Sequence, residues 1–148
     1  MKMRPIISLA LLLIMLFGFC SCEVSVVGKT DIAAMFKANK STDGVTISVK
    51  QDCGEVNLRE FTGRYILQIP KENVVEGNLY CYYTIISGEA DISYDFGVFS
   101  NTYQWFTTDV GQSAPESTYL DASVTKATIV IECTTPTTGI MTFKMGTP

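Results

Sequence analysis

Residues 90–96 read Ala-Asp-Ile-Ser-Tyr-Asp-Phe, so that apolar side chains at every second position alternate with polar ones. In an extended strand, this alternation places all the apolar side chains on one face. The same period of two occurs in residues 45–49 (Val-Thr-Ile-Ser-Val) and in residues 127–133, where Ile129, Ile131 and Cys133 are in phase. These segments are therefore predicted to be strands with one face against a core.

Other segments of the chain extend this pattern. We predict strands over residues 64–69, which end at Pro70, and over residues 103–107 and 140–145. Residues 79–86 are apolar or aromatic almost throughout, which predicts a central strand buried on both faces.

The segments between these strands carry turn signals. Turns are expected at residues 41–44, 76–78 and 134–139, and residues 109–118 are expected to form a loop. Short strands with turns every 8–12 residues or so are typical of an antiparallel sandwich. We therefore predict an all-β fold, jelly-roll-like or immunoglobulin-like, with one short helix over residues 31–38.

The N-terminal segment has the features of an export signal. Lys2 and Arg4 give it a positive start, residues 6–19 are an apolar run too short to span a bilayer comfortably, and small residues follow. We expect residues 1–22 to be a signal peptide, residues 23–30 a tether and residues 31–148 a single β-sandwich domain. The mature protein would then lie outside the cytoplasm.

The end of this segment resembles the processing site of bacterial lipoproteins, in which a small residue precedes a cysteine that is lipidated. Here Ser21 precedes Cys22, although Phe19 stands where that family usually has an aliphatic residue. The resemblance implies a lipid thioether on Cys22, and hence a membrane-anchored protein with membrane lipid as a partner. The alternative is ordinary cleavage after Cys22, which would release a secreted protein.

Composition excludes several classes of function. The chain has 15 acidic and 11 basic residues, and two of the basic residues belong to the leader, so the mature net charge is −6. An acidic surface repels phosphate backbones, and nucleic-acid binding is not expected. Histidine is absent, which removes His-based metal sites and Ser-His or Cys-His nucleophile pairs. We predict no cofactor, no metal site and no catalytic residues, and hence a non-enzymatic binding or structural role at the cell envelope.

Three cysteines follow the leader. Cys81 and Cys133 lie in phase with apolar residues, which is typical of small buried side chains. In an oxidising compartment they could also form a disulfide if their strands are neighbours. Cys53 lies in a loop-like stretch and could pair with either or stay free.

The densest group of polar and aromatic residues lies in residues 88–109. A sugar-stacking site could be built there from Trp105 and Tyr103, with Asn101 and Gln104 bonding the sugar hydroxyls. The competing interpretation places Trp105 in the core, since a lone tryptophan is usually highly buried. The partner is therefore an unknown protein or a glycan, and a glycan-binding module is the alternative function.

Two further features have structural interpretations. Asp91 and Asp95 lie on one strand face about 13 Å apart by strand rise, which is too far for one calcium ion, so we expect a solvated acidic face. Tyr80 and Tyr82 share one face of their strand, and Cys81 and Tyr83 share the other. We interpret the tyrosines as core and sheet packing, or as a protein-contact surface if that face is exposed.

Overall fold

The computed structural model describes residues 31–50, 52–74, 76–97, 101–121, 123–124 and 127–146. The predicted leader, the tether and Cys22 lie outside these residues. Among the described residues, no helix is long and apolar enough to cross a bilayer. The helix α2 (Asp31–Lys37) begins the described chain, as predicted, and the 3-10 helix η1 (Lys71–Asn73) follows the second strand.

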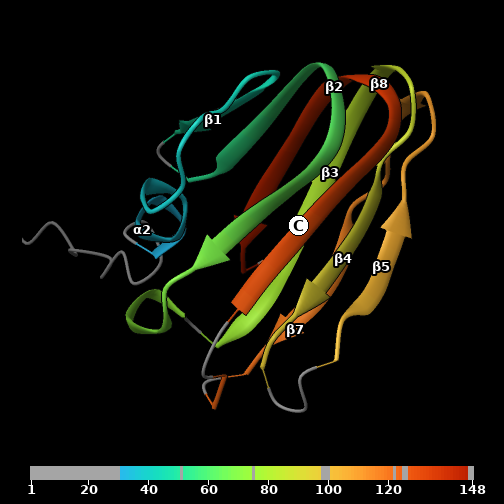
Figure 1. The fold of residues 1–148 in the computed structure, drawn as a ribbon. Coiled ribbons are helices and arrows are strands. Elements are labelled where there is room, and N and C mark those ends of the chain that lie inside the picture. The colour runs from blue at the N-terminus through green and yellow to red at the C-terminus, as the bar shows by residue number, and fades with distance from the viewer. Residues whose placement is uncertain are drawn as a thin grey trace, which may run out of the picture.

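The described residues form eight strands that pair antiparallel. Figure 1 shows their arrangement. The strands and their bounds are β1 (Val45–Val49), β2 (Gly54–Ile69), β3 (Gly77–Ser87), β4 (Asp91–Asp95), β5 (Tyr103–Thr107), β6 (Gly111–Gln112), β7 (Glu116–Leu120) and β8 (Ala127–Met145). The predicted all-β fold with one short helix is confirmed.

The two long strands, β2 and β8, pair along almost their whole length and belong to both layers of the sandwich. In the first layer, the N-terminal half of β2 and the C-terminal half of β8 continue into β1 on one side and into β3, β6 and β7 on the other. In the second layer, the other halves of β2 and β8 continue into β4 and β5. A single hydrogen-bonded sheet is thus folded over into two layers, with the corner inside its longest strands.

The corner lies where the β2–β8 register shifts, between Leu58 and Gly63. Glu60 has a φ of 50° there, in the left-handed region, and its backbone N–H donates to the Thr138 hydroxyl across the ladder at 3.0 Å. Such bulges bend a strand and let it change layers. The predicted turn over residues 134–139 was wrong, because β8 runs through this segment without a break.

A buried side chain explains how β8 passes the corner. The Thr137 hydroxyl accepts a hydrogen bond from the Glu89 N–H at 3.1 Å and donates to the Glu89 carbonyl at 2.8 Å. Pro136 has no N–H to donate, and it lies exposed in a part of β8 that has no partner in the β2 register. Side-chain bonds therefore replace ladder bonds at the point where a turn was expected.

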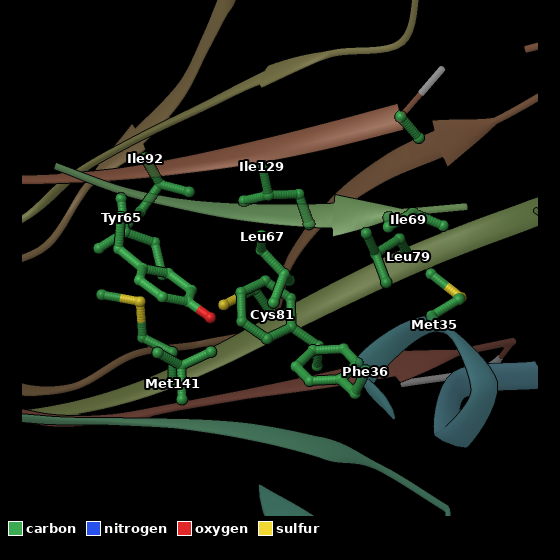
Figure 2. Close-up of a cluster of buried hydrophobic side chains, with 14 of the residues drawn as sticks. Met35, Phe36, Tyr65, Leu67, Ile69, Leu79, Cys81, Ile92, Ile129 and Met141 are labelled. Carbon is green, nitrogen blue, oxygen red and sulfur yellow. The ribbon is translucent and has the colours of Figure 1, made fainter. Parts of the chain in front are cut away.

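The core lies between the two layers and is closed at one end by helix α2. Ile32, Met35 and Phe36 of the helix are at most 1% exposed, and the Phe36 ring lies 5.5 Å from the Phe143 ring of β8. Gly54 leaves room for this ring, since a Cβ there would come within 2.3 Å of it. Figure 2 shows Met35 and Phe36 among side chains from β2, β3, β4 and β8.

The cysteines are part of this core. Cys53, Cys81 and Cys133 are all buried free thiols, so the structure does not contain the disulfide suggested between Cys81 and Cys133. Burial raises the pKa of the Cys81 thiol far above its usual range, which keeps it protonated and unreactive. The interpretation of Cys81 and Cys133 as small buried side chains is confirmed.

The exposed edge of β2 in the second layer is covered by the chain that follows the helix. The Asn39 side chain donates to the Gln68 carbonyl at 2.8 Å and accepts from the Gln68 N–H at 2.7 Å, as a neighbouring strand would. The Tyr65 hydroxyl donates to the Lys40 carbonyl. These contacts occupy the edge of β2, which could otherwise pair with a strand of another chain.

The docking of helix α2 can be tested with Phe36→Ala. Removing a fully buried aromatic ring costs about 3–5 kcal/mol of folding free energy. We expect a loss of that size in urea unfolding followed by Trp105 fluorescence. Ile66→Thr, on the outer face of β2, is the control and should change stability by no more than about 0.5 kcal/mol. A loss below about 1 kcal/mol for Phe36→Ala would mean that the helix does not close the core.

Candidate functional site

The residues predicted to form a sugar site around Trp105 lie together only in part, since the Tyr94 ring lies 5.7 Å from the Tyr103 ring and 6.1 Å from the Trp105 ring. Trp105 and Phe106 occupy a register shift between β4 and β5, and both side chains pack at the margin of the core. The Trp105 ring meets Phe106 edge-on at 5.1 Å and lies 6.5 Å from Phe143 in the opposite layer. Trp105 is therefore a partly buried residue that packs against the core.

The other three members of that set differ in what they contact. Tyr103 is 48% exposed and stacks on Tyr94, with their ring centroids 5.7 Å apart. The Gln104 amide donates weakly to the Asp91 carboxylate and to the Thr107 hydroxyl on the outer face of the second layer. Asn101 is exposed and lies before β5 begins. Side chains alternate between the two faces of β5, so the Gln104 amide lies on the face opposite to the aromatic rings.

One polar atom in this region is unsatisfied. The indole N–H of Trp105 is buried and has no hydrogen-bond partner among the described residues. Tryptophan usually finds a partner for this group when it is buried. The ring contacts the rings of Tyr94, Phe106 and Phe143, and the residue as a whole is partly exposed.

The acidic residues of β4 are engaged in local hydrogen bonds. Asp91 accepts from the Thr107 hydroxyl at 2.5 Å, and Asp95 accepts from the Gly97 N–H at 2.8 Å. No group of three or more acidic, cysteine or histidine side chains within the described ranges could hold a metal ion.

A different group of aromatic residues lies on the outer face of the first layer. Tyr80 and Tyr82 of β3 are partly exposed there, and Tyr119 of the neighbouring strand β7 is 52% exposed. We call the surface formed by Tyr80, Tyr82, Tyr119 and Lys144 the tyrosine face. Tyr80 and Tyr82 therefore do not belong to the core, and the alternative in which their face is exposed applies, while the prediction that β3 is buried on both faces was wrong.

The strand register explains how the tyrosine face is assembled. Tyr80 lies opposite Lys144 of β8 on one side and opposite Ser117 of β7 on the other. Tyr82 follows two residues along β3, about 7 Å away by strand rise. Tyr119 is on the neighbouring strand β7, opposite Asn78, which lies two residues before Tyr80 on β3. The three tyrosines therefore follow the direction of β3, the strand that pairs with both β7 and β8; Figure 1 labels these three strands.

The inward residues of β3 hold this arrangement in place. Cys81 lies at 0% exposure opposite Phe143, and the Tyr83 ring stacks on Phe106 with centroids 5.8 Å apart. The Tyr83 backbone N–H donates to the Ser113 hydroxyl at 2.9 Å. As the sequence predicted, Cys81 and Tyr83 share the face opposite to Tyr80 and Tyr82. The buried face of β3 anchors the strand, so the outer tyrosines have fixed positions.

Most charged groups around the tyrosine face are paired. The Lys144 ammonium lies 6.0 Å from the centre of the Tyr82 ring and 3.9 Å from the Asp52 carboxylate. On the neighbouring strand, Glu55 bonds Lys50 at 2.6 Å. The Tyr119 hydroxyl donates to Glu76 at 2.7 Å. The face is thus amphipathic and carries little net charge.

Such a surface suits binding rather than bond breaking. Tyrosine rings offer an apolar surface for stacking, and their hydroxyls offer hydrogen bonds at the rim. The hydroxyl and amide groups of Asn78, Ser117 and Thr142 lie on the same face at neighbouring register positions. A flat ligand with alternating apolar and hydroxyl surfaces would satisfy both kinds of group.

Sequence reasoning did not identify this surface as a ligand site, and left it as packing or a protein-contact surface, because tyrosine is ambiguous in the apolar run of residues 79–86. One signal was available, namely the period-two separation of Tyr80 and Tyr82 from Cys81 and Tyr83. Tyr119 lay just after the predicted loop, where no strand was predicted, so its place beside Tyr80 depended on a strand pairing that was not predicted.

Comparison with known proteins gives only remote likenesses. No family model and no curated protein matches the chain. A variant of a family 29 carbohydrate-binding module is 16% identical over 69% of this chain and 68% of that chain, with a TM-score of 0.40. Another variant, complexed with mannohexaose, is 14% identical over 69% and 73%, also with a TM-score of 0.40. Drosophila melanogaster CENP-C bound to CAL1 is 12% identical over 71% and 72%, with a TM-score of 0.41.

The contact between Tyr119 and Glu76 makes a testable electrostatic prediction. The hydrogen bond that the phenol donates to the carboxylate raises the pKa of the Tyr119 hydroxyl, because it favours the protonated phenol. Glu76→Gln removes the negative charge, and we expect the Tyr119 pKa to fall toward the ordinary tyrosine value. The titration is followed by the NMR shift of the ring carbon that bears the hydroxyl. The control, Glu72→Gln, should leave the Tyr119 pKa unchanged, and an equal fall in both variants would contradict the pairing.

Proposed function

We propose that this protein is an exported, membrane-anchored and non-catalytic binding module whose tyrosine face binds an extended glycan. The observation that carries the proposal is the line of three tyrosines on the outer face of one layer, with hydroxyl and amide side chains beside them. The rings lie on paired strands, and their spacing is therefore set by the backbone.

Stacking explains why a glycan suits this surface. A pyranose ring has an apolar face formed by its C–H groups and a rim of hydroxyls, which match the faces of the tyrosine rings and the polar groups around them. The line follows β3 for about 14 Å from Tyr119 to Tyr82, as judged from strand rise. A chain of sugars can contact all three rings, whereas a single sugar can contact only one.

The charges around the face favour a neutral ligand. Lys144 lies near Asp52, and Lys50 is paired with Glu55. A neutral ligand leaves these contacts intact, while a highly charged polymer would have to compete with them. The net charge of −6 for the predicted mature chain also opposes polyanionic partners.

Membrane anchoring is part of the proposal and is supported by the sequence alone. Ser21-Cys22 follows a short apolar segment with a positive start, as in bacterial lipoproteins. A lipid on Cys22 would hold the domain at the extracytoplasmic surface of a membrane. Binding of neighbouring glycan chains by many anchored copies would then be multivalent, which compensates for weak single contacts.

Glycan binding is tested with the full chain, purified in detergent, on an array of neutral oligosaccharides. Tyr82→Ala and Tyr119→Ala should each weaken binding about fivefold, since one aromatic stacking contact contributes on the order of 1 kcal/mol. Tyr103→Ala is the matched control, because Tyr103 is nearly as exposed as Tyr119 but lies on β5. It should change affinity less than about twofold, well below the effect of one lost stacking contact. The proposal fails if no glycan binds, or if Tyr103→Ala has the same effect as the other two variants.

Lipidation is tested by expressing the chain in bacteria with an alkyne-labelled fatty acid. Cys22 should carry the label, and the protein should be in the membrane fraction. Cys22→Ala should lose the label and the membrane association, while the matched control Cys20→Ala should keep both. Label on Cys20, or release of the unaltered protein into the medium, would contradict the anchor.

A further inference from the structure

A shallow hollow of about 370 Å³ lies at one end of the outer face of the first layer. Its lining includes Ile86 at the end of β3 and Ile140 of β8, together with Asn57 and Arg59 of β2. Ile140 lies opposite Thr84 in the β3–β8 register, and Thr142 lies opposite Tyr82. The hollow is therefore one step, about 7 Å of strand rise, beyond the last ring of the tyrosine face.

The walls of the hollow are apolar and exposed. Ile86 is 70% exposed and Ile140 is 42% exposed, so both are exposed large apolar side chains. Isolated exposed isoleucines are common, but here two of them line the same hollow. A ligand group that covers them must itself be apolar.

The polar groups at the rim can donate hydrogen bonds, and none of them is a carboxylate. Asn57 has an amide, Arg59 a guanidinium, and Thr46 and Thr138 have hydroxyls. The Thr138 hydroxyl already accepts a hydrogen bond from the Glu60 backbone N–H, which uses part of its hydrogen-bonding capacity. The hollow therefore combines apolar walls with donors, which suits a small group that has a methyl and an acceptor oxygen.

An anionic sugar would also find donors here, but the neighbouring residues oppose it. A second hollow of about 500 Å³ shares Arg59 and is lined by Asp43 and Glu60. Two carboxylates beside Arg59 offset the attraction of its guanidinium for a carboxylate or a sulfate. A neutral carbonyl oxygen accepts a hydrogen bond without that repulsion.

We infer that this hollow holds the acetyl group of an acetylated, neutral glycan whose backbone lies on the tyrosine face. The inference rests on the proposed function and specifies the class of ligand for the same surface. The acetyl methyl contacts Ile86 and Ile140, and the acetyl carbonyl faces Asn57 and Arg59. The sugar bearing the acetyl group follows the sugars that stack on Tyr82 and Tyr80.

The test uses two matched pairs of neutral oligosaccharides and calorimetry on the full chain in detergent. Chitohexaose and cellohexaose share a backbone and differ by N-acetyl groups in place of hydroxyls. Acetylated glucomannan oligosaccharides and the same sample after mild alkali differ in O-acetyl groups. We expect the acetylated member of at least one pair to bind about tenfold more tightly, the discrimination that one small apolar group in a pocket provides. The pair that shows the preference identifies the linkage of the acetyl group.

Variants separate this inference from the proposed function. Ile86→Thr and Ile140→Thr should remove the preference for the acetylated member and leave the affinity for the unacetylated member unchanged. Tyr82→Ala should weaken both members. The control Ile66→Thr alters an isoleucine of similar exposure (45%) on the second layer and should change neither. Threonine is β-branched, so all three substitutions preserve strand preference.

Each outcome has a distinct meaning. Equal binding of both members by the unaltered protein, with loss in Tyr82→Ala, would overturn the acetyl inference and leave the proposed function standing. Tighter binding of the unacetylated members, or a preference that survives in Ile86→Thr and Ile140→Thr, would also overturn the inference. No binding of any member would overturn the proposed function and the inference together.

Discussion

The pairing of β2 with β8 is the interaction on which the rest of this structure depends. These two strands form one ladder that crosses from the first layer to the second, so every other strand attaches directly or indirectly to one of them. The ladder can change layers only because its register shifts at the corner, where Glu60 takes a left-handed conformation and the Thr137 hydroxyl bonds Glu89. Without these local departures from strand geometry, the long strands could not bend from one layer into the other, and the sheet could not fold over to enclose a core.

The candidate site follows from the first-layer part of that ladder. Because β8 is fixed by β2 on one side, it holds β3 in a register that places Tyr80 beside Lys144 and Tyr82 beside Thr142. The inward side chains of β3 are buried, so the outer ones have one available direction. The hollow beyond the tyrosines lies near the corner, where β2 and β8 leave this layer. The tyrosine face and the hollow, which are the two proposed contact surfaces for the ligand, therefore both depend on the bent strands β2 and β8.

Sequence reasoning predicted the strands in which one face is plainly polar, such as β1, β4 and the first half of β8. It failed where the type of residue does not indicate which face of the sheet its side chain occupies. The segment from Arg59 to Gly63 has no alternation because it is a bulge, and Thr134–Gly139 has the composition of a turn although Thr137 is buried. Tyrosine is suited both to cores and to wet surfaces, so the run at residues 79–86 did not reveal its exposed face. Such positions are decided by long-range strand pairing, which composition does not encode.

The contrast between Trp105 and the tyrosines shows why a residue type alone is a weak guide to a binding surface. The register shift in β5 turns Trp105 and Phe106 toward the core, and the loss of alternation there could not be foreseen from the residues themselves. Tyr80, Tyr82 and Tyr119 lie instead on regularly paired strands, where the backbone hydrogen bonds set the distances between the rings. Little freedom remains to be lost when a ligand binds across such rings, because the strand already holds them apart at fixed steps. A surface of this kind can obtain useful affinity from contacts that are individually weak, provided that the ligand is long enough to make several of them at once.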